Sequence, residues 1–271
     1  MIIVLNLLTS QVNINKMNFF FNLNIMNTKI LYLILLFFIQ GCINTNDNKM
    51  IKIIFLGDSI TEAGVYNTEV ALQYGDELVY PQYTGFITML NENINNDVEL
   101  IGKGISGDKV SDLLTRYEED VIDLNPDIVF IYIGINDVWH KYDFGTGTDI
   151  DLYENGLREI ISAIQEKGSK IVLCTPTVIG ENTGDFMLGN QFKDVETMDK
   201  MNGDLDAYSN VIRELASEFD TELLDLRKIF MDYISDNNPN NDKSGILTYD
   251  GVHLNNQGNK LIADSMIKYI N

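Results

Sequence analysis

Apolar runs and segments with helical periodicity alternate along the chain from residue 51 onward. Five short apolar runs, bounded by turn signals, predict buried strands. They are Ile51–Leu56, Val98–Ile101, Ile128–Ile133, Ile171–Cys174 and Leu223–Leu226. Between them, apolar residues recur at spacings of three and four, which predicts amphipathic helices. These helices are expected at Tyr83–Ile94, Val110–Leu124, Leu152–Gln165, Asp204–Phe219, Arg227–Ile234 and Asn255–Ile270.

This alternation predicts a parallel sheet covered by helices on both faces, which is an α/β architecture. A stretch of about 220 residues fits a single domain, and we expect it to occupy residues 51–271. Two connections, Thr61–Pro81 and Pro176–Gly203, are longer than usual. Long loops of this kind commonly shape substrate access in α/β proteins.

The first fifty residues do not share this pattern. Lys29 precedes a short apolar run, Ile30–Ile39, which is about half the length needed to span a bilayer. The run ends at Gly41 and Cys42, and this order is typical of an export signal. Ile-Gln-Gly-Cys also resembles the lipobox of bacterial lipoproteins, which implies lipidation at Cys42. A buried hydrophobic helix that ends at the glycine is the alternative interpretation.

We therefore expect three parts: a signal segment over residues 1–41, a lipidated tether over residues 42–50, and the domain over residues 51–271. Met26 offers another start, which would leave residues 1–25 outside the protein. The expected location is outside the cytoplasm, either periplasmic or at the cell surface, with the chain anchored to a membrane through Cys42.

The chain is strongly acidic, with 40 acidic against 19 basic residues and a net charge of −21. Such a charge repels nucleic acid and anionic lipid surfaces. We expect no nucleic-acid partner, and membrane contact only through the lipid anchor. The two cysteines, Cys42 and Cys174, provide neither a disulfide framework nor a metal cluster, and Cys174 is expected in the core. Nothing in the sequence predicts the oligomeric state.

The first apolar run leads directly into Gly57-Asp58-Ser59. A parallel strand ending there would bring Ser59 to the carboxyl edge of the sheet, where α/β proteins bind ligands. The tripeptide alone favours an ordinary polar turn, because such turns are common. A serine becomes a nucleophile only when a base removes its proton, normally a histidine oriented by a carboxylate.

The chain contains two histidines, His140 and His253. Asp250 precedes His253 by three residues with Gly251 between them, so that one loop can carry a carboxylate and an imidazole together. The carboxylate could then hold the imidazole in the tautomer that a general base requires. A capping turn in which the two side chains make only local hydrogen bonds is an equally good interpretation of this spacing.

Two further turns could supply donors to an oxyanion. Gly102–Asp108 follows the second predicted strand, and Gly134–Asp137 follows the third. Backbone N–H groups at these glycine turns and an asparagine side-chain amide are suitable donors, because an oxyanion needs two or three fixed N–H groups. A phosphate-binding loop is disfavoured, because neither Gly-Lys-Ser/Thr nor the Gly-x-Gly-x-x-Gly spacing is present.

Gly57-Asp58-Ser59, Gly104, Gly134-x-Asn136-Asp137 and Asp250-x-x-His253 occur in the order and at the strand ends seen in the SGNH hydrolases, also called the GDSL esterase/lipase family. The resemblance spans roughly residues 51–270. It implies a flavodoxin-like three-layer α/β/α sandwich with a five-stranded parallel sheet in the order 2-1-3-4-5.

The resemblance also implies roles for individual residues. Ser59 would be the nucleophile, His253 the general base and then acid, and Asp250 the residue that orients the histidine. The oxyanion hole would comprise the backbone N–H groups of Ser59 and Gly104 and the side-chain amide of Asn136.

Four other positions bear on the site or its surrounding loops. Trp139 and His140 follow the third block and would border the substrate pocket, although a packed aromatic side chain and a surface histidine are equally plausible. Asp58 is expected to hydrogen-bond within its own turn. Many family members have asparagine where this chain has Gly102, which bears on the shape of that loop.

The implied function is hydrolysis of an ester through an acyl-enzyme, without metal or organic cofactor. The long loops are polar, which favours a short acyl group such as acetyl, on a small molecule or a carbohydrate. The alternatives are a lysophospholipase or thioesterase of the same family, and a non-catalytic glycan-binding lipoprotein. The presence of Ser, His and Asp together argues against the last, and two histidines are too few for a two-metal phosphodiesterase.

Overall fold

The computed structural model describes residues 50–69, 72–74, 77–79, 82–95, 97–181, 195–242 and 244–270. The expected signal segment, Cys42, nearly all of the tether, and residues 182–194 of the second long connection lie outside these residues. Met50–Asn271 forms one compact unit. A membrane-spanning helix is absent from the described residues, since none of their helices combines the required length with the required hydropathy.

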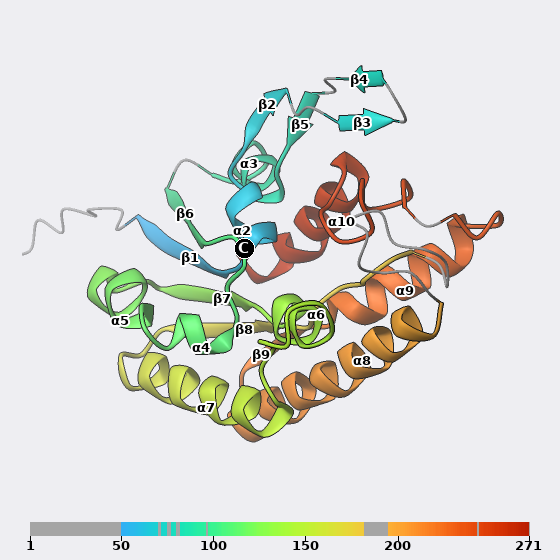
Figure 1. Ribbon diagram of the computed structural model, residues 1–271. Helices are drawn as coiled ribbons and strands as arrows, with labels where there is room; N and C mark the ends of the chain where they lie inside the picture. Colours follow the sequence, from blue (N-terminus) through green and yellow to red (C-terminus); the bar gives the residue numbers. More distant parts are fainter. Residues whose placement is uncertain are drawn as a thin grey trace, which may run out of the picture. The chain divides into compact units, whose positions relative to one another are not determined.

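The centre of the domain is a five-stranded parallel sheet (Figure 1). Its strands are β1 (Ile51–Gly57), β6 (Val98–Gly104), β7 (Ile128–Tyr132), β8 (Lys170–Cys174) and β9 (Glu222–Leu224). Their spatial order is β6-β1-β7-β8-β9, which is 2-1-3-4-5 when these five strands alone are counted along the chain. Gly57 at the end of β1 pairs with both Gly104 and Tyr132, so three strands end at the same level.

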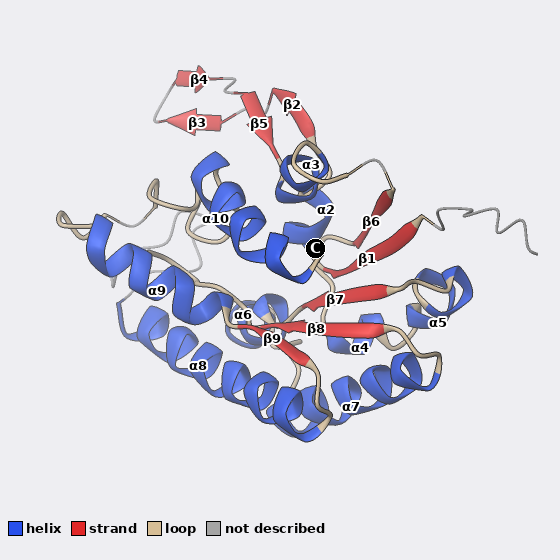
Figure 2. Ribbon diagram, turned by 180° about the vertical axis from the view of Figure 1, so that it is seen from behind, coloured by secondary structure: helices blue, strands red, loops and turns tan. Residues whose placement is uncertain are grey.

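Helices cover the two faces of the sheet and complete a three-layer sandwich (Figures 1 and 2). One face carries α4 (Val110–Leu113), α5 (Tyr117–Asp120), α7 (Ile150–Glu166) and α8 (Val195–Glu218), and on the other α3 (Phe86–Asn91) packs against α10 (Asn256–Met266). The other helices of the described residues are α2 (Ser59–Ala63), α6 (Ile135–Asp143), α9 (Leu226–Asn237) and the 3₁₀ turns η1 (Ile122–Leu124) and η2 (Ile267–Tyr269). The predicted fold class is confirmed.

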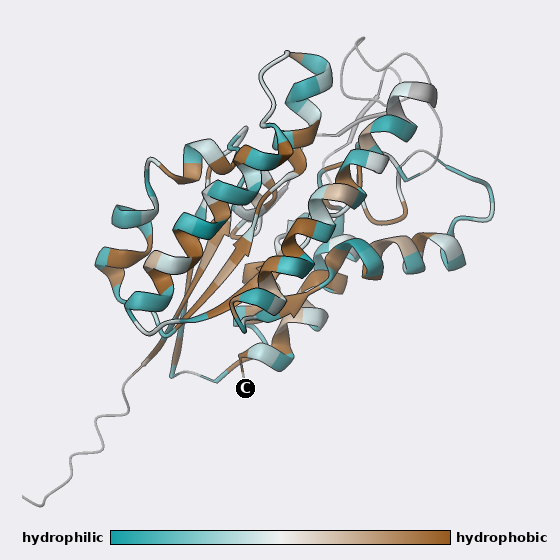
Figure 3. Ribbon diagram, turned by 90° about the horizontal axis from the view of Figure 1, so that it is seen from below, coloured by the Kyte–Doolittle hydropathy of each residue, from teal (hydrophilic) through white to brown (hydrophobic). Residues whose placement is uncertain are grey.

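The central strands β1 and β7 are mostly apolar because helices shield both faces of the sheet, whereas the edge strand β6 contains Glu99 and Lys103 (Figure 3). All five residues of β7 are buried. Phe130 of β7 stacks on Phe55 of β1 with 4.9 Å between ring centroids, and Phe86 of α3 meets Phe55 edge to face. Burying a side chain of this size contributes about 2 kcal/mol, so these contacts hold the strand ends in place. Cys174 lies in this core, as expected.

Three predicted helices differ from the structure. The helix expected from Asp204 begins at Val195, so the last residues of the predicted connection Pro176–Gly203 are helical. The segment Val110–Leu124 is not one helix but α4, α5 and η1, because Arg116 adopts a non-helical φ of −136° and its side chain reaches back to the sheet. The helix expected from Tyr83 begins at Phe86, because Tyr83 belongs to β5 (Gln82–Thr84), which pairs with β2 (Asn67–Glu69). The connection after Ser59 also contains the short pair β3 (Leu72–Tyr74) and β4 (Glu77–Val79).

Candidate active site

Ser59 is the first residue of α2, immediately after β1. Asp58 precedes it as the N-cap residue, and its side chain accepts a hydrogen bond from the N–H of Ile60 at 3.0 Å. This bond satisfies one of the N–H groups that every helix leaves unpaired at its start. The expected role of Asp58 within its turn is confirmed, but the turn continues into a helix that the sequence pattern did not predict.

A continuous chain of hydrogen bonds links three predicted site residues. The Nε2 atom of His253 lies 3.0 Å from the Oγ atom of Ser59, although the two residues are 194 positions apart. On the other side of the ring, Nδ1 of His253 lies 2.7 Å from Oδ2 of Asp250. With the proton on Nδ1 facing the carboxylate, Nε2 is free to accept the hydroxyl proton of Ser59. This is the geometry that nucleophile, base and orienting carboxylate require.

The Asp250–His253 loop is held in place by its own backbone. The second carboxylate oxygen of Asp250 accepts hydrogen bonds from the N–H groups of Val252 at 2.9 Å and His253 at 2.7 Å. The carboxylate therefore cannot rotate away from the imidazole without losing both bonds. The His253 side chain keeps 22% of its surface exposed, so a substrate can reach the relay from solvent.

Two opposing effects set the pKa of His253. Burial favours the neutral imidazole, but the hydrogen bond and negative charge of Asp250, helped by the charge of Asp58, favour the protonated form and raise the pKa of His253 above its usual value. The ring of Tyr249 stacks on that of His253 with 5.9 Å between centroids and 16° between planes.

The end of β6 approaches the start of α2 closely. A Cβ atom added to Gly104 would lie 2.1 Å from the backbone nitrogen of Glu62 and 2.6 Å from the carbonyl oxygen of Asp58. No side chain fits there, which explains glycine at this position. The next residue, Ile105, donates its N–H to the carbonyl oxygen of Gly57 at 3.2 Å. The structure thus brings Gly104 next to the first turn of the helix that begins with Ser59.

Asn136 lies in the first turn of α6, next to the carboxyl end of β7. Its side chain is 3% exposed, and its Nδ2 atom donates to the carbonyl oxygen of Asp108 at 3.0 Å. The sequence pattern predicted this block after a strand but not the helix. A signal for α6 was present, because the apolar residues Ile135, Val138, Trp139 and Tyr142 recur at helical spacing.

Two buried carboxyl groups, those of Asp58 and Asp137, lie in the same part of the structure. Burial raises the pKa of Asp58 to about 7, although the hydrogen bond from Ile60 and the charge of His253 act in the opposite direction. Burial likewise raises the pKa of Asp137 to about 6, against the hydrogen bonds from Thr148 and Val110. Asp137 accepts the N–H of Val110 and so joins the start of α6 to the start of α4.

Arg116 is a supporting residue that the sequence analysis missed. Its guanidinium donates to the carbonyl oxygen of Gly57 at 2.9 Å and to that of Lys103 at 3.1 Å, and so ties together the ends of β1 and β6. It also forms ion pairs with Asp108 at 2.8 Å and Asp120 at 2.6 Å. The local sequence pattern gives no sign of this role, because the carbonyl partners of Arg116 belong to other elements, β1 and β6.

Trp139 and His140 lie on α6, away from the Asp250–His253 loop in sequence. Trp139 is partly buried and packs against the core. The His140 ring meets that of Phe144 edge to face with 5.0 Å between centroids, and burial followed by the charge of Lys109 lowers the pKa of His140. His140 also lies beside Gly107 of the turn after β6. A contact of either residue with substrate stays a prediction.

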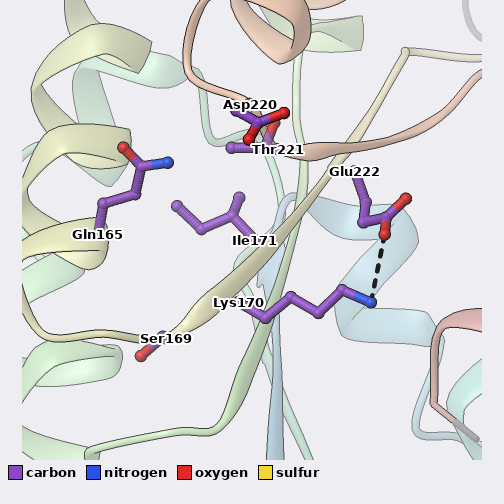
Figure 4. A pocket seen from close by; sticks show the side chains of 7 residues that line it. All are labelled: Gln165, Ser169, Lys170, Ile171, Asp220, Thr221 and Glu222. Atoms are coloured by element: carbon purple, nitrogen blue, oxygen red, sulfur yellow. Dashed lines mark ion pairs between the residues drawn. The ribbon is translucent and has the colours of Figure 1, made fainter.

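A cavity of about 330 Å³ lies at the opposite edge of the sheet (Figure 4). Its lining includes Lys170 and Glu222, the first residues of β8 and β9, which form an ion pair at 3.5 Å. The relay, by contrast, lies where β1 ends. No group of three or more His, Cys, Asp or Glu side chains within the described part of the chain is arranged to hold a metal ion.

A hydrogen-bonded serine, histidine and aspartate at the carboxyl edge of a parallel α/β/α sandwich define a site of the serine-hydrolase type. The chain belongs to the GDSL-like Lipase/Acylhydrolase family, whose model matches residues 55–261. It is a carboxylic ester hydrolase.

Three similar proteins add detail. An acetylxylan esterase from Geobacillus stearothermophilus is 30% identical over 81% of this chain and 93% of its own length. The crystal structure of the acetyl xylan esterase AlAXEase has 41% sequence identity and a TM-score of 0.67, covering 82% of this chain and all of the other. The uncharacterized lipoprotein YqeF of Bacillus subtilis (strain 168) is 21% identical over 88% of this chain and 95% of its own.

Proposed function

We propose that this protein is a serine esterase that removes short acyl groups, principally acetyl, from a carbohydrate. The observation that carries the proposal is the relay itself, with 3.0 Å between His253 Nε2 and Ser59 Oγ and 2.7 Å between His253 Nδ1 and Asp250 Oδ2. Ser59 is the nucleophile, His253 the general base, and Asp250 the residue that orients and stabilises the imidazolium.

In the first half-reaction, Ser59 Oγ attacks the ester carbonyl carbon while its proton moves to His253 Nε2. The carbonyl π electrons move to oxygen, and the resulting oxyanion accepts hydrogen bonds from the backbone N–H groups of Ser59 and Gly104 and from the Asn136 side chain. Asn136 uses one N–H on Asp108 and has a second for this purpose. The intermediate then collapses, the bond to the alcohol oxygen breaks, and His253 returns its proton to the leaving alcohol.

In the second half-reaction, water replaces the alcohol. His253 Nε2 takes a proton from the water as it attacks the acyl-enzyme carbonyl, and the same donors receive the second oxyanion. The bond to Ser59 Oγ breaks, His253 protonates that oxygen, and the acid leaves. Every proton in the cycle is carried by His253, so the reaction requires neither a metal nor an organic cofactor.

The preference for acetyl on a carbohydrate is supported by the names of two relatives, which are both acetylxylan esterases. It is also supported by the acidic, polar character of the chain, which suits a neutral polyhydroxylated substrate better than an anionic lipid. A panel of nitrophenyl esters from acetyl to palmitoyl, followed by acetylated xylo-oligosaccharides, tests this preference. Maximal kcat/KM at octanoyl or longer would instead indicate a lysophospholipase or thioesterase.

Replacing Ser59 or His253 by alanine tests the mechanism. Each change should lower kcat on nitrophenyl acetate by a factor on the order of 10⁴ or more, because nucleophile and base act as a unit. The thermal midpoint should change little, since Ser59 and His253 are both partly exposed.

Ser162→Ala is the matched control. Its hydroxyl lies on α7 and donates only to the backbone of its own helix, to the carbonyl of Arg158. This variant should keep full activity. Substantial turnover by Ser59→Ala or His253→Ala would contradict the proposed mechanism.

A further inference from the structure

A buried carboxylate outside the relay holds the loop that carries Asp250 and His253. Glu181 follows β8 and is 4% exposed. Its Oε2 atom accepts the N–H of Ile246 at 2.8 Å, and its Oε1 atom accepts the N–H groups of Leu247 at 2.6 Å and Thr248 at 2.5 Å. Oε1 also accepts the hydroxyl of Thr248 at 2.8 Å. One side chain therefore binds four donors of a single turn.

This turn leads directly into the catalytic loop. The hydroxyl group of Thr248 donates its O–H to Glu181, and its oxygen accepts the N–H of Gly251 at 3.0 Å. Thr248 also forms an isolated antiparallel bridge with Leu254, and Tyr249 donates its N–H to the carbonyl of His253 at 2.9 Å. The hydrogen bonds thus run from Glu181 through Thr248 into both sides of the segment that contains Asp250 and His253.

The residue before Glu181 holds the same loop. The N–H of Gly180 donates to the carbonyl of Gly251 at 2.7 Å. Gly251 has a φ of +98°, and the segment is neither helix nor sheet, so its buried N–H groups need partners from elsewhere in the fold. A carboxylate provides the strongest such partner, because charge-assisted hydrogen bonds are roughly twice as strong as neutral ones.

We propose that Glu181 is a positioning residue of the esterase reaction, because it sets the place of Asp250 and His253 relative to Ser59. The inference rests on the proposed function. Ser59 belongs to α2, whereas Asp250 and His253 belong to a loop near the other end of the chain. The position of the His253 imidazole relative to Ser59 therefore depends on contacts that fix this loop. Glu181 acts through the loop and touches neither substrate nor reacting atoms.

The variants Glu181→Gln and Glu181→Ala test the proposal. Glutamine keeps an oxygen for Leu247 and Thr248, but its amide nitrogen would face the N–H of Ile246 and cannot accept it. We expect kcat on nitrophenyl acetate to fall about 10-fold for glutamine and about 100-fold for alanine, because a displacement of about 1 Å at a catalytic group costs up to 100-fold. KM should stay within about twofold, since the proposal moves no substrate contact.

Glu218→Gln is the matched control for the charge change. Glu218 is exposed on α8, pairs with Arg158, and should show unchanged kcat when replaced. A second readout is the downfield proton resonance of the hydrogen bond between His253 Nδ1 and Asp250. The chain has two histidines, so a His140→Ala variant assigns this resonance to His253. In Glu181→Gln the resonance should shift or broaden, and the thermal midpoint should fall by a few degrees, because the N–H of Ile246 loses its acceptor.

A double variant separates positioning from general stability. In a His253→Ala background, adding Glu181→Gln should cause no further loss of kcat, because the histidine through which Glu181 acts is gone. Unchanged kcat and an unchanged resonance in Glu181→Gln would overturn the inference, as would a further loss in the double variant. An inactive wild-type protein with a normal resonance would instead refute the proposed function, while the resonance in Glu181→Gln would still test the positioning.

Discussion

In the proposed mechanism, the protonation state of His253 determines when Ser59 can be activated, because an imidazole accepts a proton only while it is neutral. Burial favours that neutral form, whereas Asp250 and Asp58 favour the protonated form and raise the pKa of His253 overall. The same carboxylate that keeps the ring in place therefore moves the working range toward higher pH. The phenol of Tyr249, which stacks on the His253 ring, stays uncharged over this pH range because burial raises its pKa.

The pH dependence of activity follows from this balance. We expect kcat/KM to rise with pH along a limb whose midpoint lies above the ordinary histidine value of 6.5. Asp250→Asn should move that midpoint to lower pH and lower kcat by a factor on the order of 10⁴, because the ring loses its partner and its tautomer. Rate profiles between pH 5 and pH 9 provide the measurement. A midpoint that stays in place in Asp250→Asn would contradict this account of the pKa.

The free energy of unfolding should also depend on pH through His253. Because folding raises the pKa of His253, protonation of His253 stabilises the folded protein. This contribution is fully present below the pKa of the unfolded state and is lost as the pH rises through the pKa of the folded state. Asp250→Asn should reduce this loss. Thermal melts of both proteins at pH 5 and pH 9 measure the difference.

The approach of α2 to β6 brings Ser59, the proposed nucleophile, close to Gly104, a proposed oxyanion donor. It is possible only because Gly104 has no side chain, and Arg116 reinforces it by joining the carbonyl groups of Gly57 and Lys103. Arg116 leaves the helical conformation to make these bonds, which is why the predicted helix over Val110–Leu124 is broken.

Gly104→Ala should therefore disable the enzyme. Its Cβ would lie 2.1 Å from the backbone of α2, which cannot rotate aside as a side chain can. We expect kcat to fall at least 100-fold and stability to fall by about 1–3 kcal/mol, the usual cost of overpacking.

Gly203→Ala is the matched control, a glycine position where an added Cβ should cause no clash. Gly203 lies within α8, and a Cβ there meets nothing within 4 Å. Alanine should stabilise the protein by about 0.5–1 kcal/mol with activity unchanged, because glycine is a poor helix former. Thermal melts and kcat of both variants provide the test. An active, stable Gly104→Ala protein would show that the end of β6 is more adaptable than the packing indicates.

Met50–Asn271 forms one compact unit that contains every residue of the proposed mechanism. We expect a protein beginning at Met50 to fold cooperatively and to match the activity of the longer protein, because the relay and its supports all lie after that residue. Cys42, in contrast, should affect location only: Cys42→Ala should release the protein from membranes without changing kcat.

Thermal melts and kcat test the protein that begins at Met50. Fractionation of cells labelled with a radioactive fatty acid tests the Cys42→Ala variant. A chain from Met50 that aggregates would contradict the proposed boundary, and incorporation of the label into Cys42→Ala would contradict the anchor.

The five strands and the four motif blocks could be predicted because their signals are local. Strands buried on both faces are mostly apolar, and Ser59, Gly104, Asn136 and His253 lie at or just after strand ends or before the last helix. The helices α2 and α6 were missed, since each begins at once after a strand and was hidden by the motif that it contains.

Pattern along the chain was thus sufficient for the layer architecture and for the edge of the sheet that bears the site, because these follow from neighbours a few positions apart. The resemblance to the SGNH hydrolases was needed to give the relay residues their expected roles. The folded protein alone decided that His253 reaches Ser59, that Arg116 joins β1 to β6, and that Glu181 holds the loop of Asp250. Each of these contacts joins segments distant in sequence, and their geometry depends on how the layers pack, which no local periodicity encodes.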